Sequence, residues 1–124
     1  MITKSLKGKG EADYDFKQDI LFFKTKGREY KKSIELDNMV LDIDEEGFIV
    51  GIQIFEASKF LNLKKDVLLS IPTWQYQATF YEGRIEVRLM FQIKVRNKII
   101  EKNPIIMQSI SEPLPNSELV CTVS

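Results

Sequence analysis

The chain has 124 residues, of which 44% are hydrophobic and 29% are charged, as in an ordinary globular protein. Its 18 basic side chains balance 18 acidic ones, so no net charge favours nucleic acid or an anionic membrane. No apolar run approaches the roughly 20 residues that cross a bilayer, and the opening MITKSLKGKGEADYDF lacks the apolar core of a secretory signal. We therefore expect a single cytoplasmic domain over residues 1–124.

Two residue types are nearly missing from the chain. Histidine is absent, which excludes a histidine-based triad, a histidine general base and imidazole ligands for a metal. Cysteine occurs once, as Cys121; it can form no internal disulfide, and we interpret it as a small apolar residue in a terminal segment. We therefore predict a protein that is not an enzyme and binds no metal or cofactor.

The N-terminal segment, residues 1–12, combines lysines and glycines: Lys4, Lys7, Gly8, Lys9 and Gly10. Such a composition argues against packed structure. We expect a flexible basic arm.

The following residues alternate apolar and polar side chains, as strands do. The pattern predicts a strand from about Asp19 to Lys26, and two short strands on either side of a tight turn or bulge at Asp37-Asn38. The run GFIVGIQIF (47–55) predicts a further strand. Since both of its faces are partly apolar, we expect a central strand with something packed on each side.

Helical spacing of apolar residues replaces the alternation over residues 56–71. We expect either one helix broken near Asn62 or two short helices, ended by Pro72. Ser58 stands at the start of this segment. We interpret its hydroxyl as a helix cap, which stabilises a helix by about 1 kcal/mol, and not as a nucleophile.

Residues 72–110 show the clearest strand pattern in the chain. A type I′ turn at Glu82-Gly83 would give four apolar pairs on one face: Phe80 with Ile85, Ala78 with Val87, Tyr76 with Leu89, and Trp74 with Phe91. A second turn at Asn97-Lys98 would bring Val95 against Ile100. Pro104 predicts a third strand that is bulged or at an edge. Residues 111–124 read as a loop and a tail, with a short final strand at ELVCTV as the alternative.

The run LDIDEEGFIVGIQI partly matches a calcium-binding EF-hand loop, with Asp42, Asp44, Glu46 and Gly47 at the expected spacing. Gln53 replaces the bidentate glutamate that closes such a site, and strands flank the loop where helices are required. We interpret the run as a hairpin whose turn places Gly47 in the left-handed bulge position.

The same run and its surroundings resemble a bacterial and archaeal family, Domain of Unknown Function 2283, over about residues 14–61. The residues that carry the resemblance are Tyr14, Asp15, Asp19, Leu21, Phe22, Asp42, Asp44, Gly47, Gly51, Ile52, Ile54, Ala57 and Ser58. Gln53 departs from the family's usual acid. The resemblance implies a small antiparallel sheet followed by a helix, with no established function. Because short members are often encoded beside toxin-like proteins, it also implies an antitoxin-like binding role.

Two sets of side chains are candidate sites. Asp15, Asp19, Asp42 and Asp44 could meet at one sheet edge for acid–base or metal chemistry; the alternative, which we favour, is that they hold backbone amides at turns. Basic residues and a tyrosine could bind single-stranded nucleic acid, and these are Lys4, Lys7, Lys9, Tyr81, Arg84, Arg88, Lys94 and Arg96. Cross-strand ion pairs with Glu82, Glu86 and Glu101 would explain the second set without a ligand.

These patterns together predict an α+β fold: a mostly antiparallel sheet built from two β-meanders, with the helical segment 56–71 between them. We expect a non-enzymatic protein–protein interaction module, antitoxin-like or self-associating, that forms a homodimer or binds a small protein. The alternative is a nucleic-acid-binding module that uses the arm and the basic face. No membrane contact is expected.

Overall fold

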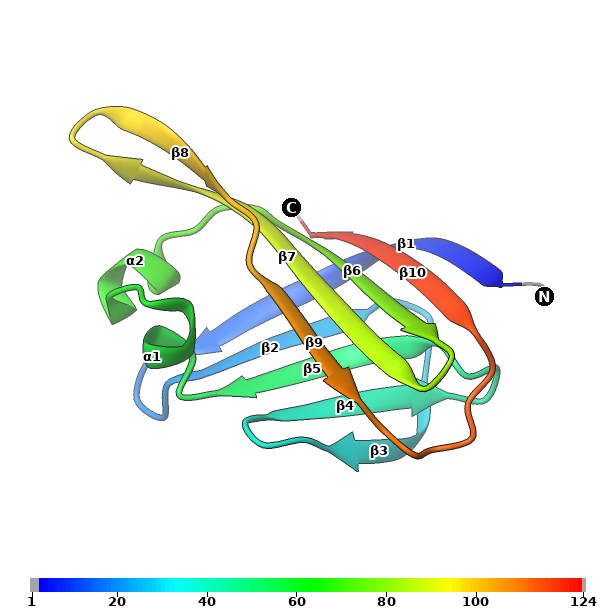
Figure 1. Ribbon diagram of the computed structural model, residues 1–124. Helices are drawn as coiled ribbons and strands as arrows, with labels where there is room; N and C mark the ends of the chain where they lie inside the picture. The colour runs from blue at the N-terminus through cyan, green and yellow to red at the C-terminus, as the bar shows by residue number, and fades with distance from the viewer. Residues whose placement is uncertain (1–2, 124) are drawn as a thin grey trace.

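The computed structural model describes residues 3–123, and strands dominate it (Figure 1). In this part of the chain the strands are β1 (Lys4–Asp15), β2 (Ile20–Thr25), β3 (Tyr30–Glu35), β4 (Met39–Asp44), β5 (Ile49–Phe55), β6 (Trp74–Tyr81), β7 (Arg84–Val95), β8 (Lys98–Lys102), β9 (Ile105–Ser109) and β10 (Ser117–Val123). Two five-residue helices, α1 (Ala57–Leu61) and α2 (Lys65–Leu69), lie between β5 and β6.

The ten strands join in the order β3-β4-β5-β2-β1-β10-β6-β7-β8, with β9 also paired to β7. All pairs are antiparallel except β1 with β10, which places the first and last strands side by side (Figure 1). β1 pairs with β10 through residues 4–9 and with β2 through residues 10–15. It therefore belongs to an N-terminal layer (residues 10–15 with β2–β5) and to a C-terminal layer (residues 4–9 with β6–β10).

The two layers pack against each other around one apolar core. Phe23 of the N-terminal layer contacts Trp74 and Tyr76 of the C-terminal layer, with ring centroids 5.3 and 5.4 Å apart. The hydroxyls of Thr25 and Tyr76 are hydrogen-bonded at 2.5 Å across the same interface. Because these buried hydroxyls are partners for each other, the core contains polar groups without the cost of leaving them unpaired.

The α+β expectation is wrong, because the two helices together hold only ten residues, five each, beside ten strands of one sheet in residues 3–123. The helical segment does break at Asn62, whose φ of 55° is left-handed. The expected packing on both sides of β5 is also wrong: β5 is central, between β4 and β2, but Gln53 on its outer face is only partly buried.

The expectation of a flexible arm is wrong over the described part of residues 1–12. The expectation of a tail is wrong over 117–123, where the alternative of a short final strand is confirmed as β10. Both segments are paired strands in the middle of the sheet. In β1 the inward positions hold small or apolar residues, and Gly10 is buried between Lys24 and Cys121. Cys121 is itself fully buried. The glycines thus allow the adjacent strands to approach β1 closely, and they do not make the segment flexible.

The β6–β7 hairpin confirms its prediction: Glu82 and Gly83 have φ of 49° and 78°, and the four apolar pairs form and are buried. The next turn is displaced by one residue, since positive φ falls on Arg96 and Asn97 and Val95 pairs with Lys98. The third strand lies at the edge as expected, divided around Pro104 into β8 and β9.

We predict that Gly10→Ala destabilises the fold more than Gly8→Ala. A Cβ at Gly10 would come within 2.6 Å of the Lys24 carbonyl oxygen, which is backbone, whereas at Gly8 the nearest atom is the Thr25 Cγ2 at 3.1 Å. We expect about 2 kcal/mol or more for the first substitution and under about 1 kcal/mol for the second, measured by urea unfolding followed through Trp74 fluorescence. Equal losses would contradict the role given to Gly10.

Candidate functional site

The structure brings four of the predicted basic residues onto one surface, the outer face of the C-terminal layer. Lys7 of β1, Gln77 of β6 and Arg88 of β7 lie in one row across the sheet, connected through Val120 of β10. Lys9 lies in the next row on the same side. We call Lys7, Lys9, Arg84 and Arg88 the basic face.

The remaining members of the predicted set lie elsewhere. Lys4 pairs with the buried Ser117 and lines a hollow beside the β4–β5 turn. Lys94 belongs to an exposed hairpin, β7–β8, that projects from the body of the molecule, and Arg96 lies at its tip (Figure 1). Tyr81 remains beside Arg84, its partner across the β6–β7 hairpin, and is 53% exposed.

The basic face is only partly compensated by acids. Glu86 forms an ion pair with Arg88 at 3.7 Å within the same strand, and Glu118 accepts a hydrogen bond from Gln77 at 3.0 Å. Glu101 accepts one from Gln92 on the projecting hairpin. In residues 3–123 the expected cross-strand ion pairs do not form.

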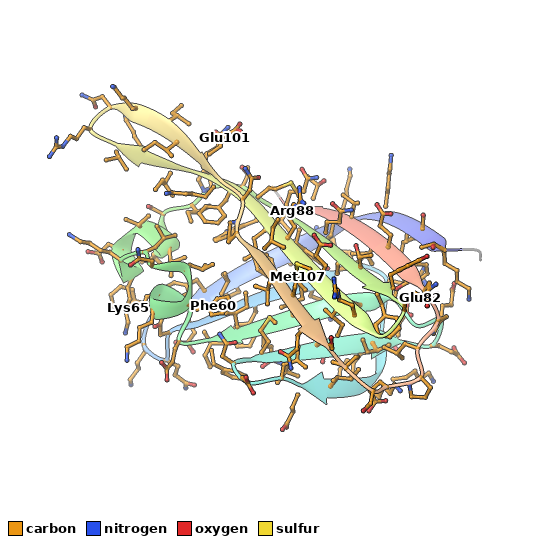
Figure 2. All side chains as sticks on the ribbon, in the orientation of Figure 1. Phe60, Lys65, Glu82, Arg88, Glu101 and Met107 are labelled. Carbon is orange, nitrogen blue, oxygen red and sulfur yellow. The ribbon has the colours of Figure 1, made fainter. Side chains whose placement is uncertain are left out.

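An exposed apolar edge lies next to the basic face, and the sequence patterns did not predict it. Of the ten large apolar or aromatic side chains that are exposed in the described residues, five belong to the end of β7, to β8 and to β9: Val95, Ile99, Ile100, Ile105 and Met107. Within this edge Ile105 pairs with Arg88 of β7, and Met107, labelled in Figure 2, pairs with Glu86. The only signal in the sequence was the run IIMQS, which has no charged residue.

The four aspartates do not form one cluster. Asp44 holds the β4–β5 turn: its Oδ1 accepts hydrogen bonds from the amides of Glu46 and Phe48 at 3.0 and 2.9 Å. Gly47 has φ 92°, in the bulge position, and Arg28 pairs with the Asp44 carboxylate at 3.3 Å. The hairpin interpretation of this run is therefore confirmed.

Asp19 joins the β1–β2 turn to the start of α1. Its carboxylate accepts hydrogen bonds from the Tyr14 hydroxyl (2.6 Å), the Ser58 amide (3.0 Å) and the Ser58 hydroxyl (2.6 Å). Ser58 is thus not the cap of this helix, because the helix amide is capped from another segment by Asp19. Burial raises the pKa of Asp19, but the hydrogen bonds from Ser58 and Tyr14 and the charge of Lys65 outweigh it and lower the pKa.

The other two aspartates make separate local contacts. Asp15 accepts a hydrogen bond from the Gln18 amide at 2.9 Å, and Asp42 accepts one from the Ser33 hydroxyl at 2.7 Å. Asp15 therefore holds a turn amide, as we expected of this set. Asp42 instead lies on the outer face of the N-terminal layer.

The fold and its surfaces describe a small two-layered β-protein with an open apolar edge and a basic face. The family model for "Protein of unknown function (DUF2283)" matches residues 12–58. A Methanosarcina mazei protein named "Putative hypoxanthine phosphoribosyltransferase" is 34% identical over 113 residues, which cover 88% of this chain and 92% of that protein. "Uncharacterized protein MJ0789" of Methanocaldococcus jannaschii is 30% identical over 113 residues, 90% of this chain and 97% of that protein. No solved structure shows significant similarity to this chain. The chain therefore belongs to one family with these two archaeal proteins, and it contains a DUF2283 segment, residues 12–58, followed by a C-terminal extension.

We predict that Asp19→Asn destabilises the fold near neutral pH and that the loss shrinks in acid. The pKa of Asp19 is lower in the folded chain than its ordinary value of 3.8. Ionised Asp19 therefore stabilises the fold at pH above about 4, and this contribution disappears as the pH falls through the folded-state pKa. Urea unfolding of both proteins between neutral pH and about pH 3 measures the difference, with Asp37→Asn as the control. A difference that does not change with pH would contradict this assignment.

Proposed function

We propose that the protein is a non-enzymatic protein–protein interaction module that self-associates through the edge formed by β8 and β9. The observation that supports this proposal most strongly is the composition of β9. It is an edge strand with two large exposed side chains, Ile105 at 47% and Met107 at 55%, and it has no charged residue. Such an edge is a template for strand addition by another chain.

The backbone of β9 is oriented for that addition. Ile106 pairs with Val87, and the Leu89 amide donates to the Pro104 carbonyl at 3.0 Å. Residues 104 and 106 therefore direct their backbone groups toward β7, and the alternate residues Ile105 and Met107 direct theirs outward. Within residues 3–123 no strand pairs with this outer edge.

A second copy of the chain is the occupant that this edge fits. If two β9 strands pair antiparallel about a two-fold axis at Ile106, Ile105 of each copy opposes Met107 of the other. Apolar side chains then meet on one face, and a two-fold axis places the same patch on both partners. Stable interfaces bury about 1,200–2,000 Å², so we include β8, with its exposed Ile99 and Ile100, in the contact.

The names of the two relatives do not decide between an enzyme and a binding protein. One relative is named as a transferase, and the name of the other states no activity. The proposal rests instead on the surface of this chain.

A small partner protein that adds a strand to the same edge would be the antitoxin-like form of the interaction. Measurement of the mass of the complex separates this form from self-association.

We expect the purified protein to have the mass of a dimer in sedimentation equilibrium at micromolar concentration. Met107→Lys would bury an ammonium group against Ile105 of the other copy, which costs free energy because the charge has no partner there, and should raise the dimer dissociation constant at least about tenfold. Met107→Pro would remove the outward amide, which an edge position tolerates in the monomer, with a similar effect. Leu69→Lys, at a side chain that is 58% exposed on α2, is the matched control and should remain dimeric. A monomeric wild-type protein, or a dimeric Met107→Lys variant, would overturn the proposal.

A second candidate function, binding of single-stranded nucleic acid, is supported by the row that joins Lys7 to Arg88 across four strands. Open sheet faces with basic side chains and an aromatic residue bind RNA in this way.

For this candidate we expect a fluorescein-labelled oligouridine to bind with an affinity that falls steeply with salt. The double variant Lys7→Gln and Arg88→Gln should weaken binding about tenfold or more, whereas Lys65→Gln on α2 should not. Fluorescence anisotropy at several salt concentrations is the measurement. An unchanged anisotropy at micromolar protein in low salt would exclude the basic face as a nucleic-acid site.

A further inference from the structure

The outer face of the N-terminal layer contains a groove of about 330 Å³, on the opposite side of the sheet from the core. Strands β1, β2, β4 and β5 form its floor. Arg28, between β2 and β3, and Tyr30, the first residue of β3, form its rim. The volume lies at the lower end of the range for small-molecule sites. We call it the outer groove.

A glycine on the floor of the outer groove allows the Asp42 carboxylate to lie over it. A row of residues runs across five strands in the order Glu11, Lys24, Gly51, Asp42 and Ser33. Gly51 in the middle has no side chain, and a Cβ there would lie 2.8 Å from the Asp42 Oδ2. The other oxygen of this carboxylate, Oδ1, accepts a hydrogen bond from the Ser33 hydroxyl at 2.7 Å, which holds the carboxylate over Gly51.

The charges that remain unpaired in the outer groove are mostly negative. Arg28 is already engaged, by Asp44 at 3.3 Å and Glu46 at 3.0 Å. The other charged residues of the lining are Glu11, Asp13, Asp42 and Lys24. None of these four takes part in an ion pair within residues 3–123. Three carboxylates thus face one ammonium group, which favours a cation in the space between them.

Aromatic rings reinforce this preference. Phe22 lies in the next row of the sheet, between Asp13 and Gln53, and Tyr30, 61% exposed, stands at the rim. The faces of aromatic rings attract ammonium and guanidinium groups, by about 0.5–1 kcal/mol at exposed sites. Carboxylates bind the same groups through charge-assisted hydrogen bonds.

We propose that the outer groove binds a small organic cation, with a guanidinium or ammonium group placed against the Asp42 carboxylate that lies over Gly51. Phe22 and Tyr30 would cover the aliphatic body of the ligand. The binding site is separate from the β8–β9 edge, so this proposal does not depend on self-association.

Agmatine, which carries a guanidinium and an ammonium group on a short aliphatic chain, is a suitable probe. Titrated into the ¹⁵N-labelled protein, it should shift the amide resonances of residues around the groove, above all Gly51 and Gln53. Butylurea, neutral and of similar shape, should shift them at least about tenfold less at equal concentration, since the charge carries the recognition. Millimolar affinity suffices for this measurement.

Three variants test the assignment of residues. Asp42→Asn keeps the oxygen that accepts from Ser33 and should weaken agmatine binding about tenfold. Gly51→Ala should displace the Asp42 carboxylate, because a Cβ there would lie 2.8 Å from its Oδ2, and should weaken agmatine binding similarly. Glu45→Gln, at an exposed turn residue outside the groove lining, is the control and should bind as the wild type does. Equal shifts with butylurea, no shifts with agmatine, or full binding by a folded Asp42→Asn protein would each overturn the proposal.

Discussion

The whole architecture depends on the change of partner within β1. Its first half pairs in parallel with the last strand of the chain, and its second half pairs antiparallel with the next strand. The change falls at Gly10, where the Lys24 carbonyl leaves no room for a side chain. Because one strand belongs to both layers, their facing surfaces are held at the spacing that Phe23, Trp74 and Tyr76 fill. Pairing the two ends of the chain also requires contacts of very high sequence separation, which predicts slow folding.

The net charge of the chain is zero, but β1 places its basic and acidic residues on different surfaces. Lys7 and Lys9 project from the outer face of the C-terminal layer, whereas Glu11 and Asp13, on the same side of the strand, project from the outer face of the N-terminal layer. The molecule therefore has a basic face on the outside of the C-terminal layer and an acidic groove on the outside of the N-terminal layer. Because the 18 basic and 18 acidic residues balance over the whole chain, the net charge alone gave no indication of either surface.

Sequence reasoning succeeded where a feature is local and one face is buried. The Glu82-Gly83 turn, the bulge at Gly47 and the break at Asn62 all depend on a few neighbouring residues. It failed for β1, because small inward residues resemble a disordered composition, although their strict alternation with charged residues was a readable strand signal. The turn at Arg96-Asn97 was misplaced because both faces of the hairpin are exposed there, so no buried pattern selects the register. The outer groove was beyond prediction, since it forms only when five strands align.

The two free edges of the sheet differ in a way that points to β9. The edge strand β3 contains Lys31, Lys32 and Glu35, and charged residues of this kind oppose the approach of another strand. At the opposite edge, Lys98 and Lys102 of β8 and the following Pro104 give similar protection. Only β9, with the sequence IIMQS, has no such residue in the described part of the sheet edges. The charged residues at the other edges and the apolar composition of β9 support our proposal that a partner strand adds at β9.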